Sequence, residues 1–278
     1  MSTEPFTEST IPALDEASEL VLGALSSAST ASDVGRFCES AVRERLMQRV
    51  ERSQRAASAF HTVRPVPVWS ELDGLRVRWL YEAQPGHVAR PGQPWRVRQL
   101  EVAPGSSVAV SIGQAGVRCE WLVMSGDVVI DAVVLAVRDY HVATSTARPF
   151  MLATRDGARL FLREASAGAN AEHPHTVRDC EAPWVRLSSH IERRVLCQWD
   201  QEAALLYRLH AGVQVPHHGH AHDEECLVLE GEVFIDDELL RPGEYQLAPA
   251  GSHHEGVSSD TGSILFAHGD IELAITHR

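Results

Sequence analysis

The second half of this chain of 278 residues repeats part of the first half. When residue 120 is aligned with residue 225 without a gap, thirteen of forty-five positions are identical between residues 120–164 and 225–269. EWLVMSGDVVID lies over ECLVLEGEVFID, and Tyr140 lies over Tyr245. Upstream the matching offset becomes 116, which places Arg78 over Arg194. Because chance gives far fewer identities at one offset, the repeat predicts two copies of one fold in tandem.

Both copies have the sequence texture of a β protein. From residue 63, short apolar runs alternate with clusters of Gly, Pro, Asp and Ser, as in strands joined by turns. In the first copy the runs are LRVRWLYE, WRVRQLEV, SSVAVSI, EWLVM, VVID and RLFLRE. Such a rhythm is typical of a β-sandwich or barrel. We therefore expect an all-β fold with one domain at 63–168, a linker at 169–180 and a second domain at 181–278.

Residues 1–62 have a different, helical pattern. One helix is predicted where apolar residues recur at helical spacing, at Ala17, Leu20, Val21 and Ala24. A second is predicted from about Asp33 to Ala57, with arginines on one side, at Arg43, Arg45, Arg49, Arg52 and Arg55. We interpret the pair as a helical hairpin packed on the domain behind it, with a partner-binding arm as the alternative.

Charge and cysteine usage limit where the protein works. The formal net charge of −13 argues against direct binding of nucleic acid or an anionic membrane. The five cysteines are widely spaced and odd in number, which fits reduced thiols in the cytoplasm. The start MSTEPFTEST has no basic and apolar signal pattern, and no apolar stretch is long enough to span a bilayer. We therefore expect a cytoplasmic protein that is not bound to a membrane.

Histidines gather in residues 212–256, which hold six of the fifteen in the chain. In a strand alternate residues share a face, so His218 and His220 project to the same side. Glu224 follows four residues later, and the PAGSHH turn returns a further histidine, His254, about thirty residues on. Imidazole and carboxylate groups together bind divalent metals. The predicted ligands are His218, His220, Glu224 and His254.

This spacing resembles the two motifs of the cupin superfamily. The first motif is met at Gly212, His218, His220, Glu224 and Gly231, and the second at Pro249, Gly251 and His254. The resemblance implies two cupin domains, each a double-stranded β-helix jelly roll, behind a short N-terminal helical segment. A competing register, with His220, His222 and Glu225, fits neither flanking glycine. The remaining histidines are expected beside the site rather than in it: His217, His222 and His253.

Only the second copy has the ligands. Cys119 takes the place of Glu224, and Pro149 takes the place of His254. We therefore expect one divalent metal per chain. Zinc is the leading candidate, while iron, manganese, nickel and copper also suit nitrogen and oxygen ligands. Cys119 is expected to be a small buried hydrophobe.

A narrower resemblance is to the cupin domain of ChrR-type anti-sigma factors. It rests on Arg208, Leu209 and Gly212, followed by the run from His218 to Gly231. The resemblance implies a cytoplasmic stress-responsive transcription regulator whose N-terminal zinc-binding helical domain holds a sigma factor. Before His61, however, this sequence has no histidine and only one cysteine, Cys38, so it lacks that zinc motif. A sigma factor would bind here through the helical hairpin alone.

Two functions remain open, and with them whether the protein is an enzyme. The first is a ChrR-like regulator; the second is a mononuclear metal-dependent oxygenase acting on a diketone-like molecule. Glu225 is either a general base of such an enzyme or, as we favour, an outward-facing surface acid. A pocket with polar groups that reaches the metal would favour the enzyme, and exposed apolar surface on residues 15–50 the regulator. Homo-oligomerisation is also left open.

Overall fold

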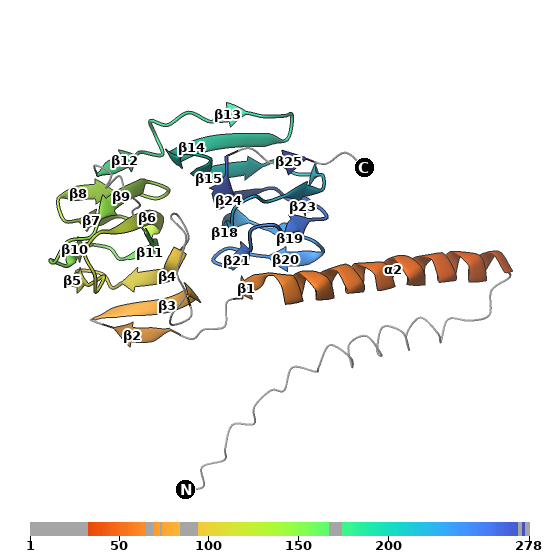
Figure 1. The fold of residues 1–278 in the computed structure, drawn as a ribbon, viewed down its shortest axis with the longest axis horizontal. Coiled ribbons are helices and arrows are strands. Elements are labelled where there is room, and N and C mark those ends of the chain that lie inside the picture. Colours follow the sequence, from red (N-terminus) through yellow and green to blue (C-terminus); the bar gives the residue numbers. More distant parts are fainter. Residues whose placement is uncertain are drawn as a thin grey trace, which may run out of the picture. The chain divides into compact units, whose positions relative to one another are not determined.

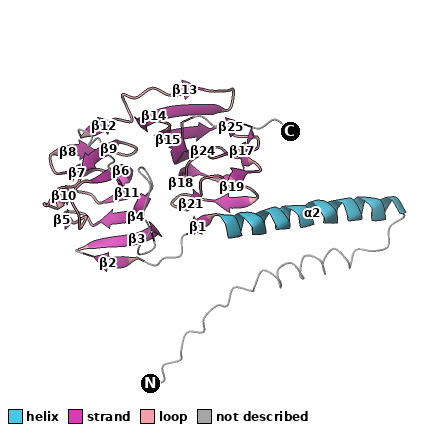
Figure 2. Ribbon diagram, viewed as in Figure 1, coloured by secondary structure: helices cyan, strands magenta, loops and turns pink. Residues whose placement is uncertain are grey.

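The structure is a computed structural model that describes residues 33–64, 69–72, 74–83, 94–166, 174–271 and 274–275. These residues form β-strands and one long helix, α2 (Asp33–Ala59) (Figures 1 and 2). The second predicted helix is confirmed as α2, whereas the first, at residues 17–24, lies outside the described residues. Among the described helices none is long and apolar enough to cross a membrane.

The chain divides into two compact units, Met1–Val50 and Glu51–Arg278. In the first, the described part is the beginning of α2. Its side chains between residues 40 and 50 are mostly exposed, including Val42 at 43% and Met47 at 41%. The second unit contains the end of α2 and two β-barrels.

The first barrel consists of a seven-stranded and a four-stranded antiparallel sheet. The larger sheet has the order β12 (His175–Val177), β9 (Tyr140–Thr144), β6 (Val117–Gly126), β11 (Ala158–Ser166), β4 (Pro94–Val102), β3 (Leu75–Glu82) and β2 (Ser70–Leu72). The smaller has the order β5 (Ser107–Val110), β10 (Phe150–Ala153), β7 (Val128–Ile130) and β8 (Val133–Leu135).

The second barrel repeats this arrangement. Its seven-stranded sheet has the order β1 (His61–Val63), β21 (Tyr245–Ala248), β18 (Glu224–Gly231), β24 (Ser263–Asp270), β15 (Glu202–Leu209), β14 (Ile191–Trp199) and β13 (Val185–Arg186). The four-stranded sheet is β16 (Val213–Val215), β23 (Val257–Ser259), β19 (Val233–Ile235) and β20 (Glu238–Leu240). A small third sheet contains β22 (His253–His254), β17 (His218–Gly219) and β25 (Ala274–Ile275). The predicted all-β fold in two copies is confirmed.

The two barrels exchange their edge strands. β1 precedes the first barrel in sequence but pairs with β21 of the second, with Val63 opposite Tyr245. β12 precedes the second barrel but pairs with β9 of the first, with Val177 opposite Tyr140. Both strands begin the same tetrapeptide, His-Thr-Val-Arg, at residues 61–64 and 175–178. The segment expected as a linker, 169–180, therefore includes a strand that completes the first barrel.

Apolar side chains form a cluster in each barrel and a third cluster between the barrels. The third combines residues of both copies, and its aromatic rings are in contact: the ring centroids of Phe161 and Phe266 are 5.1 Å apart. Burial of apolar surface is the main stabilising contribution in such an interface. The two copies therefore share a core in addition to the exchanged strands.

A buried charge network lies within this interface. The Arg163 guanidinium donates to Glu225 Oε1 at 2.6 Å and to Glu120 Oε1 at 2.7 Å. The Tyr140 hydroxyl donates to Glu120 and the Tyr245 hydroxyl to Glu225, at 2.7 and 2.9 Å. These pairs occupy equivalent positions of the repeat. Our expectation of an outward-facing Glu225 was wrong: its side chain is 1% exposed, because β18 turns that face toward the other barrel.

Within this network, Glu120 stays ionised despite its burial, whereas burial raises the pKa of Glu225. Burial by itself favours the neutral form of Glu120, but the guanidinium groups of Arg163 and Arg118 outweigh that effect and lower the pKa of Glu120 to about 2. The carboxylate is therefore charged at neutral pH, and its interaction with Arg163 has to offset the cost of desolvation.

Substitution of Arg163 by methionine tests this dependence. Both carboxylates would remain buried without their shared cation, so we expect the free energy of unfolding to fall by about 3–5 kcal/mol. The measurement is urea unfolding followed by circular dichroism and tryptophan fluorescence. The control is Arg155→Ala, because the Arg155 side chain is 91% exposed and its pairing with Asp156 lies on the surface. Equal unfolding midpoints for the two variants would contradict a stabilising role for the network.

Candidate metal centre

The antiparallel pairing of β17 with β22 brings the two histidine motifs together. His218 lies opposite His254, and Gly219 lies opposite His253. The chain after β17 is held to the β22 turn by two backbone hydrogen bonds, from His220 N to Ser252 O and from Gly251 N to His220 O. Gly251 has a φ of +82°, a conformation that glycine adopts without strain.

The four predicted ligand residues converge inside the second barrel. Donor atoms of His218, His220 and Glu224 lie within 4.8 Å of one another. Glu224 Oε2 is 3.3 Å from His220 Nε2 and 3.3 Å from His254 Nε2. The ring centroids of His220 and His254 are 4.8 Å apart, and all three imidazoles are at most 4% exposed.

Hydrogen bonds behind the rings orient two of these imidazoles. His218 Nδ1 donates to the Pro216 carbonyl at 2.9 Å, and His254 Nδ1 lies 3.0 Å from Asp236 Oδ2. These bonds leave the Nε2 atoms directed at the centre, as is usual for metal-binding histidines. Asp236 Oδ1 also accepts hydrogen bonds from the backbone N–H groups of Glu255 and Gly256.

Sequence reasoning missed Asp236. The signal was present, because Asp236 aligns with Asp131 in the repeat. Both residues occupy a turn at positive φ, and Asp131 accepts a backbone hydrogen bond from Met151 N, at the position equivalent to Gly256 N. The second barrel has therefore reused a turn residue of the shared fold to orient a ligand.

The donor set fits a divalent cation. Both ring nitrogens of His220 are buried without a hydrogen-bond partner, which a cation would relieve. Burial lowers the pKa of His220. Burial alone would raise the pKa of Glu224, but hydrogen bonding and positive charge from the histidines outweigh it and lower this pKa to about 2. Neutral imidazole and ionised carboxylate are the forms that bind metal. Burial lowers the pKa of His254, but Asp236 and Glu224 raise it to about 9, so an arriving cation would displace a proton.

The competing ligand register does not form a site. The imidazole of His222 is 40% exposed and lies against Asp270, with Nδ1 2.5 Å from Oδ1. Glu225, the other member of that register, faces Arg163 in the interface between the barrels. His217 and His253 lie beside the centre on the neighbouring positions of their strands.

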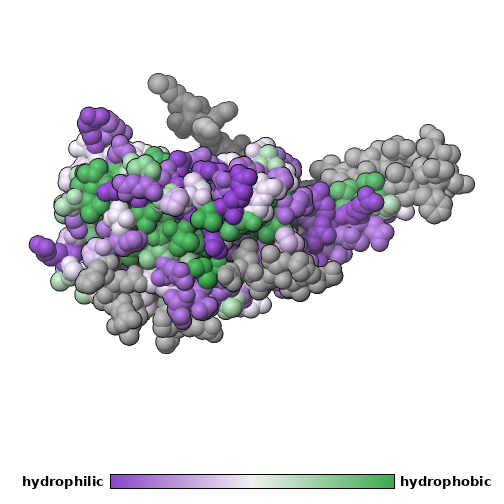
Figure 3. All heavy atoms as spheres, turned by 90° about the horizontal axis from the view of Figure 1, so that it is seen from above, coloured by the Kyte–Doolittle hydropathy of each residue, from purple (hydrophilic) through white to green (hydrophobic). Residues whose placement is uncertain are grey.

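A cavity of about 490 Å³ reaches the centre. His218, Glu224 and His254 line it together with mainly apolar side chains, and Arg193 and Tyr207 add polar groups. Leu187 lines the cavity and is 48% exposed, so the cavity opens to the surface beside the β13–β14 hairpin. Hydrophobic residues are also visible among polar ones on the face of the molecule seen from above (Figure 3). The centre is therefore accessible to a small, largely apolar molecule.

In the first barrel, aromatic side chains occupy a position that corresponds to the cavity lining of the second. Trp121, which occupies the position of Cys226 in the repeat, is fully buried and packs against Phe150 with ring centroids 5.3 Å apart. Cys119, at the position of Glu224, is also fully buried, and burial raises the pKa of its thiol. Cys119 is thus a small buried side chain, as expected, in a barrel filled by aromatic rings.

Alanine substitutions distinguish ligands from neighbours. We expect His218→Ala and His254→Ala each to weaken metal binding at the centre strongly, because a lost imidazole leaves an incomplete donor set. The matched control is His222→Ala, which removes a histidine close in sequence that points away. The measurement is calorimetric titration of metal-stripped protein with Zn²⁺. Equal losses of affinity in all three variants would mean that the ligand register is wrong.

Comparison with known proteins agrees with this description. The family model of the ChrR cupin-like domain matches residues 172–272. A sequence search of curated proteins finds no match. Among solved structures, the chain is similar to a putative glyoxylate-induced protein from Pseudomonas aeruginosa, with a TM-score of 0.61, 11% identity and coverage of 80% of this chain and 92% of that chain.

Two further structures extend the likeness. One is a mutant oxalate decarboxylase from Bacillus subtilis, with a TM-score of 0.56, 13% identity and coverage of 77% and 78%. The other is a cupin 2 conserved barrel domain protein from Leptotrichia buccalis, with a TM-score of 0.50, 13% identity and coverage of 73% and 92%. At such identities the structures establish the fold alone. The chain therefore has a tandem cupin fold, and its residues 172–272 match the family model of the ChrR cupin-like domain.

Proposed function

We propose that this protein is a cytoplasmic regulator of the ChrR type, in which the metal centre of the second barrel controls the N-terminal helix α2. The observation that carries the proposal is a contact between the two. The Phe60 ring, directly after α2, packs edge-on against the imidazole of His254, with ring centroids 4.9 Å apart and planes at 62°.

Two further contacts join the end of α2 to the same place. Ala56 and Phe60 form a small buried cluster with Ala248 of β21. One turn earlier, Arg52 pairs with Asp237 at 2.8 Å. Asp237 directly follows Asp236, whose carboxylate orients His254, so the Arg52 anchor lies on the turn that supports this ligand.

The chemistry of His254 gives this contact two states. Without a cation, His254 Nε2 is hydrogen-bonded to Glu224; with one, Nε2 would be a ligand and the ring would lose a proton. A charged and a metal-bound imidazole differ in position and in their interaction with the edge of Phe60. If the contact between Phe60 and His254 differs in free energy between the two states, the fraction of molecules in which the end of α2 packs on the barrel differs as well.

The proposed partner is a sigma factor that binds α2. Val42 and Met47 are both more than 40% exposed, so two apolar side chains of the part of α2 that precedes the anchors face solvent. Arginines lie beside them in sequence and offer charged contacts. A partner that binds α2 would cover these apolar side chains and pair with the arginines. The ChrR likeness of residues 172–272 is the reason for naming a sigma factor.

Hydrogen exchange measured by mass spectrometry tests the connection. We expect Zn²⁺ loading to slow amide exchange severalfold in residues 51–63 of the full chain. In Phe60→Ala this difference should disappear while zinc binding at the centre persists, because Phe60 is not a ligand. The matched control is Met47→Ala, a substitution in the same helix that should retain the effect. Unchanged exchange on loading of the original protein would refute the connection, as would an equal effect in Phe60→Ala. Recovery of a sigma factor with the protein from its native host tests the partner separately.

A second candidate function is favoured by the cavity. An oxygenase needs a small molecule beside its metal, and the cavity brings one to His218, Glu224 and His254, with Tyr207 and Arg193 available to orient it. Glu225 cannot act as its base, because its carboxylate faces Arg163 rather than the cavity. The cavity equally serves a regulator that binds its signal molecule.

Oxygen consumption separates the two candidates. The iron-loaded enzyme would take up oxygen with a suitable diketone, and His218→Ala prepared in the same way should be inactive. The regulator is expected to show no uptake above that variant across a series of diketones. Uptake that depends on His218 would support the oxygenase over the regulator.

A further inference from the structure

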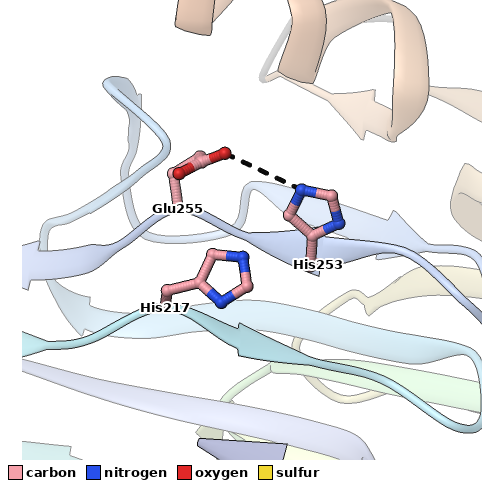
Figure 4. Close-up of side chains that lie close together, drawn as sticks. All are labelled: His217, His253 and Glu255. Atoms are coloured by element: carbon pink, nitrogen blue, oxygen red, sulfur yellow. Dashed lines mark ion pairs between the residues drawn. The ribbon is translucent and has the colours of Figure 1, made fainter. Parts of the chain in front are cut away.

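We infer a second divalent-cation site on the outside of the second barrel, formed by His217, His253 and Glu255. This site, here called the outer site, is distinct from the centre formed by His218, His220, Glu224 and His254. Figure 4 shows its three side chains close together. His253 belongs to β22, Glu255 directly follows β22, and His217 directly precedes β17, which pairs with β22. Nothing in the repeat or in the cupin motifs predicts it.

The outer site follows from the same strand pairing that builds the centre. In a strand, neighbouring side chains point to opposite faces. Since His218 and His254 point into the barrel, His217 and His253 point out of it. Gly219 lies opposite His253, and continuing that register places Glu255 opposite His217. The doubled histidines, at 217–218 and 253–254, thus provide two metal-binding faces from one pair of strands.

The geometry suits a cation after a small adjustment. One donor atom from each of the three side chains lies within 4.8 Å of the others. His253 Nε2 is 3.7 Å from Glu255 Oε1, and the imidazole centroids of His217 and His253 are 5.0 Å apart. Donors around a tetrahedral zinc are separated by about 3.3 Å, given zinc–nitrogen distances of about 2.0–2.1 Å. His253 and Glu255 are 53% and 39% exposed, so rotation about their side-chain bonds can close this difference.

An independent observation points to a ligand. Both ring nitrogens of His217 are buried, and neither has a hydrogen-bond partner. A buried polar group without a partner destabilises the folded state. A cation held with His253 and Glu255 would give one of these nitrogens a partner.

The donors identify the class of cation. Two imidazoles and one carboxylate suit zinc, nickel or copper, whereas magnesium and calcium require mostly oxygen ligands. Three protein ligands also leave a coordination position for water. Asp236 lies between the two sites, since Oδ2 contacts His254 and Oδ1 holds the backbone N–H of Glu255. With the outer site, we expect two cations per chain instead of one.

Zinc stoichiometry tests the inference. The full chain is stripped with a chelator, dialysed against Zn²⁺ alone and assayed for bound metal. We expect two zinc ions for the original sequence. His253→Ala should retain one, held by the centre, and the adjacent substitution His254→Ala should retain one, held by the outer site. Glu255→Gln should lower the affinity of the outer site and leave the centre unchanged.

The adjacent pair of substitutions separates the two proposals. If His253→Ala binds as much zinc as the original sequence, the outer site is refuted, whatever His254→Ala does. If His253→Ala loses one ion and His254→Ala loses none, the outer site stands and the centre fails. His210→Ala is the control, because this exposed histidine belongs to neither site. Loss of an ion in His210→Ala as well would indicate unspecific binding by surface histidines and would also overturn the inference. Thermal unfolding of each variant checks that it is folded.

Discussion

The pairing of β17 with β22 is the constraint on which the metal chemistry of this protein depends. Two short strands are joined with His218 opposite His254, and their flanks with Glu224 complete the donor set. A shift of one residue between these two strands would turn His218 and His254 to opposite faces. Asp236 then fixes both His254 and the backbone of the following residues. The positions of the ligand side chains are therefore set mainly by the backbone hydrogen bonds between β17 and β22, and the hydrogen bond to Asp236 then orients the imidazole of His254.

The two barrels show how one fold is used in two ways. Both have the same sheet order and the same turn aspartate, and the second has a cavity that reaches its candidate metal centre. In the first barrel Trp121 occupies the space that Cys226 leaves open in the second. A filled barrel is a better structural support, because dense packing contributes stability that a cavity forfeits. The first copy thus supports the second through their common core and the exchanged strands.

The end of α2 contacts the candidate metal centre, and the proposed regulation depends on this contact. Phe60 touches His254, and Arg52 pairs with the residue that follows Asp236. Neither Phe60 nor Arg52 is among the candidate ligands, so the helix end contacts the centre from outside its donor set. Such an arrangement allows the state of the centre to change the packing of the helix without altering the fold of either barrel. The cavity supplies a route by which a small molecule reaches the same imidazole.

The fold class, the tandem repeat and the four residues that converge at the centre could all be predicted from the amino-acid sequence. This was possible because strand alternation and motif spacing are local properties, readable from His218, His220 and Glu224 without knowledge of the fold. The placement of Glu225 could not be predicted in this way. Alternation of side chains along the strand predicted an exposed Glu225, whereas the structure buries it between the barrels. The face opposite the ligands is covered by another barrel, and no local pattern reports that contact. Tertiary contacts also account for four other features: the exchange of β1 with β12, the role of Asp236, the contact of Phe60 with His254, and the outer site. Each depends on which distant segments meet in space, and pairing between distant segments is fixed by the packing of the whole chain.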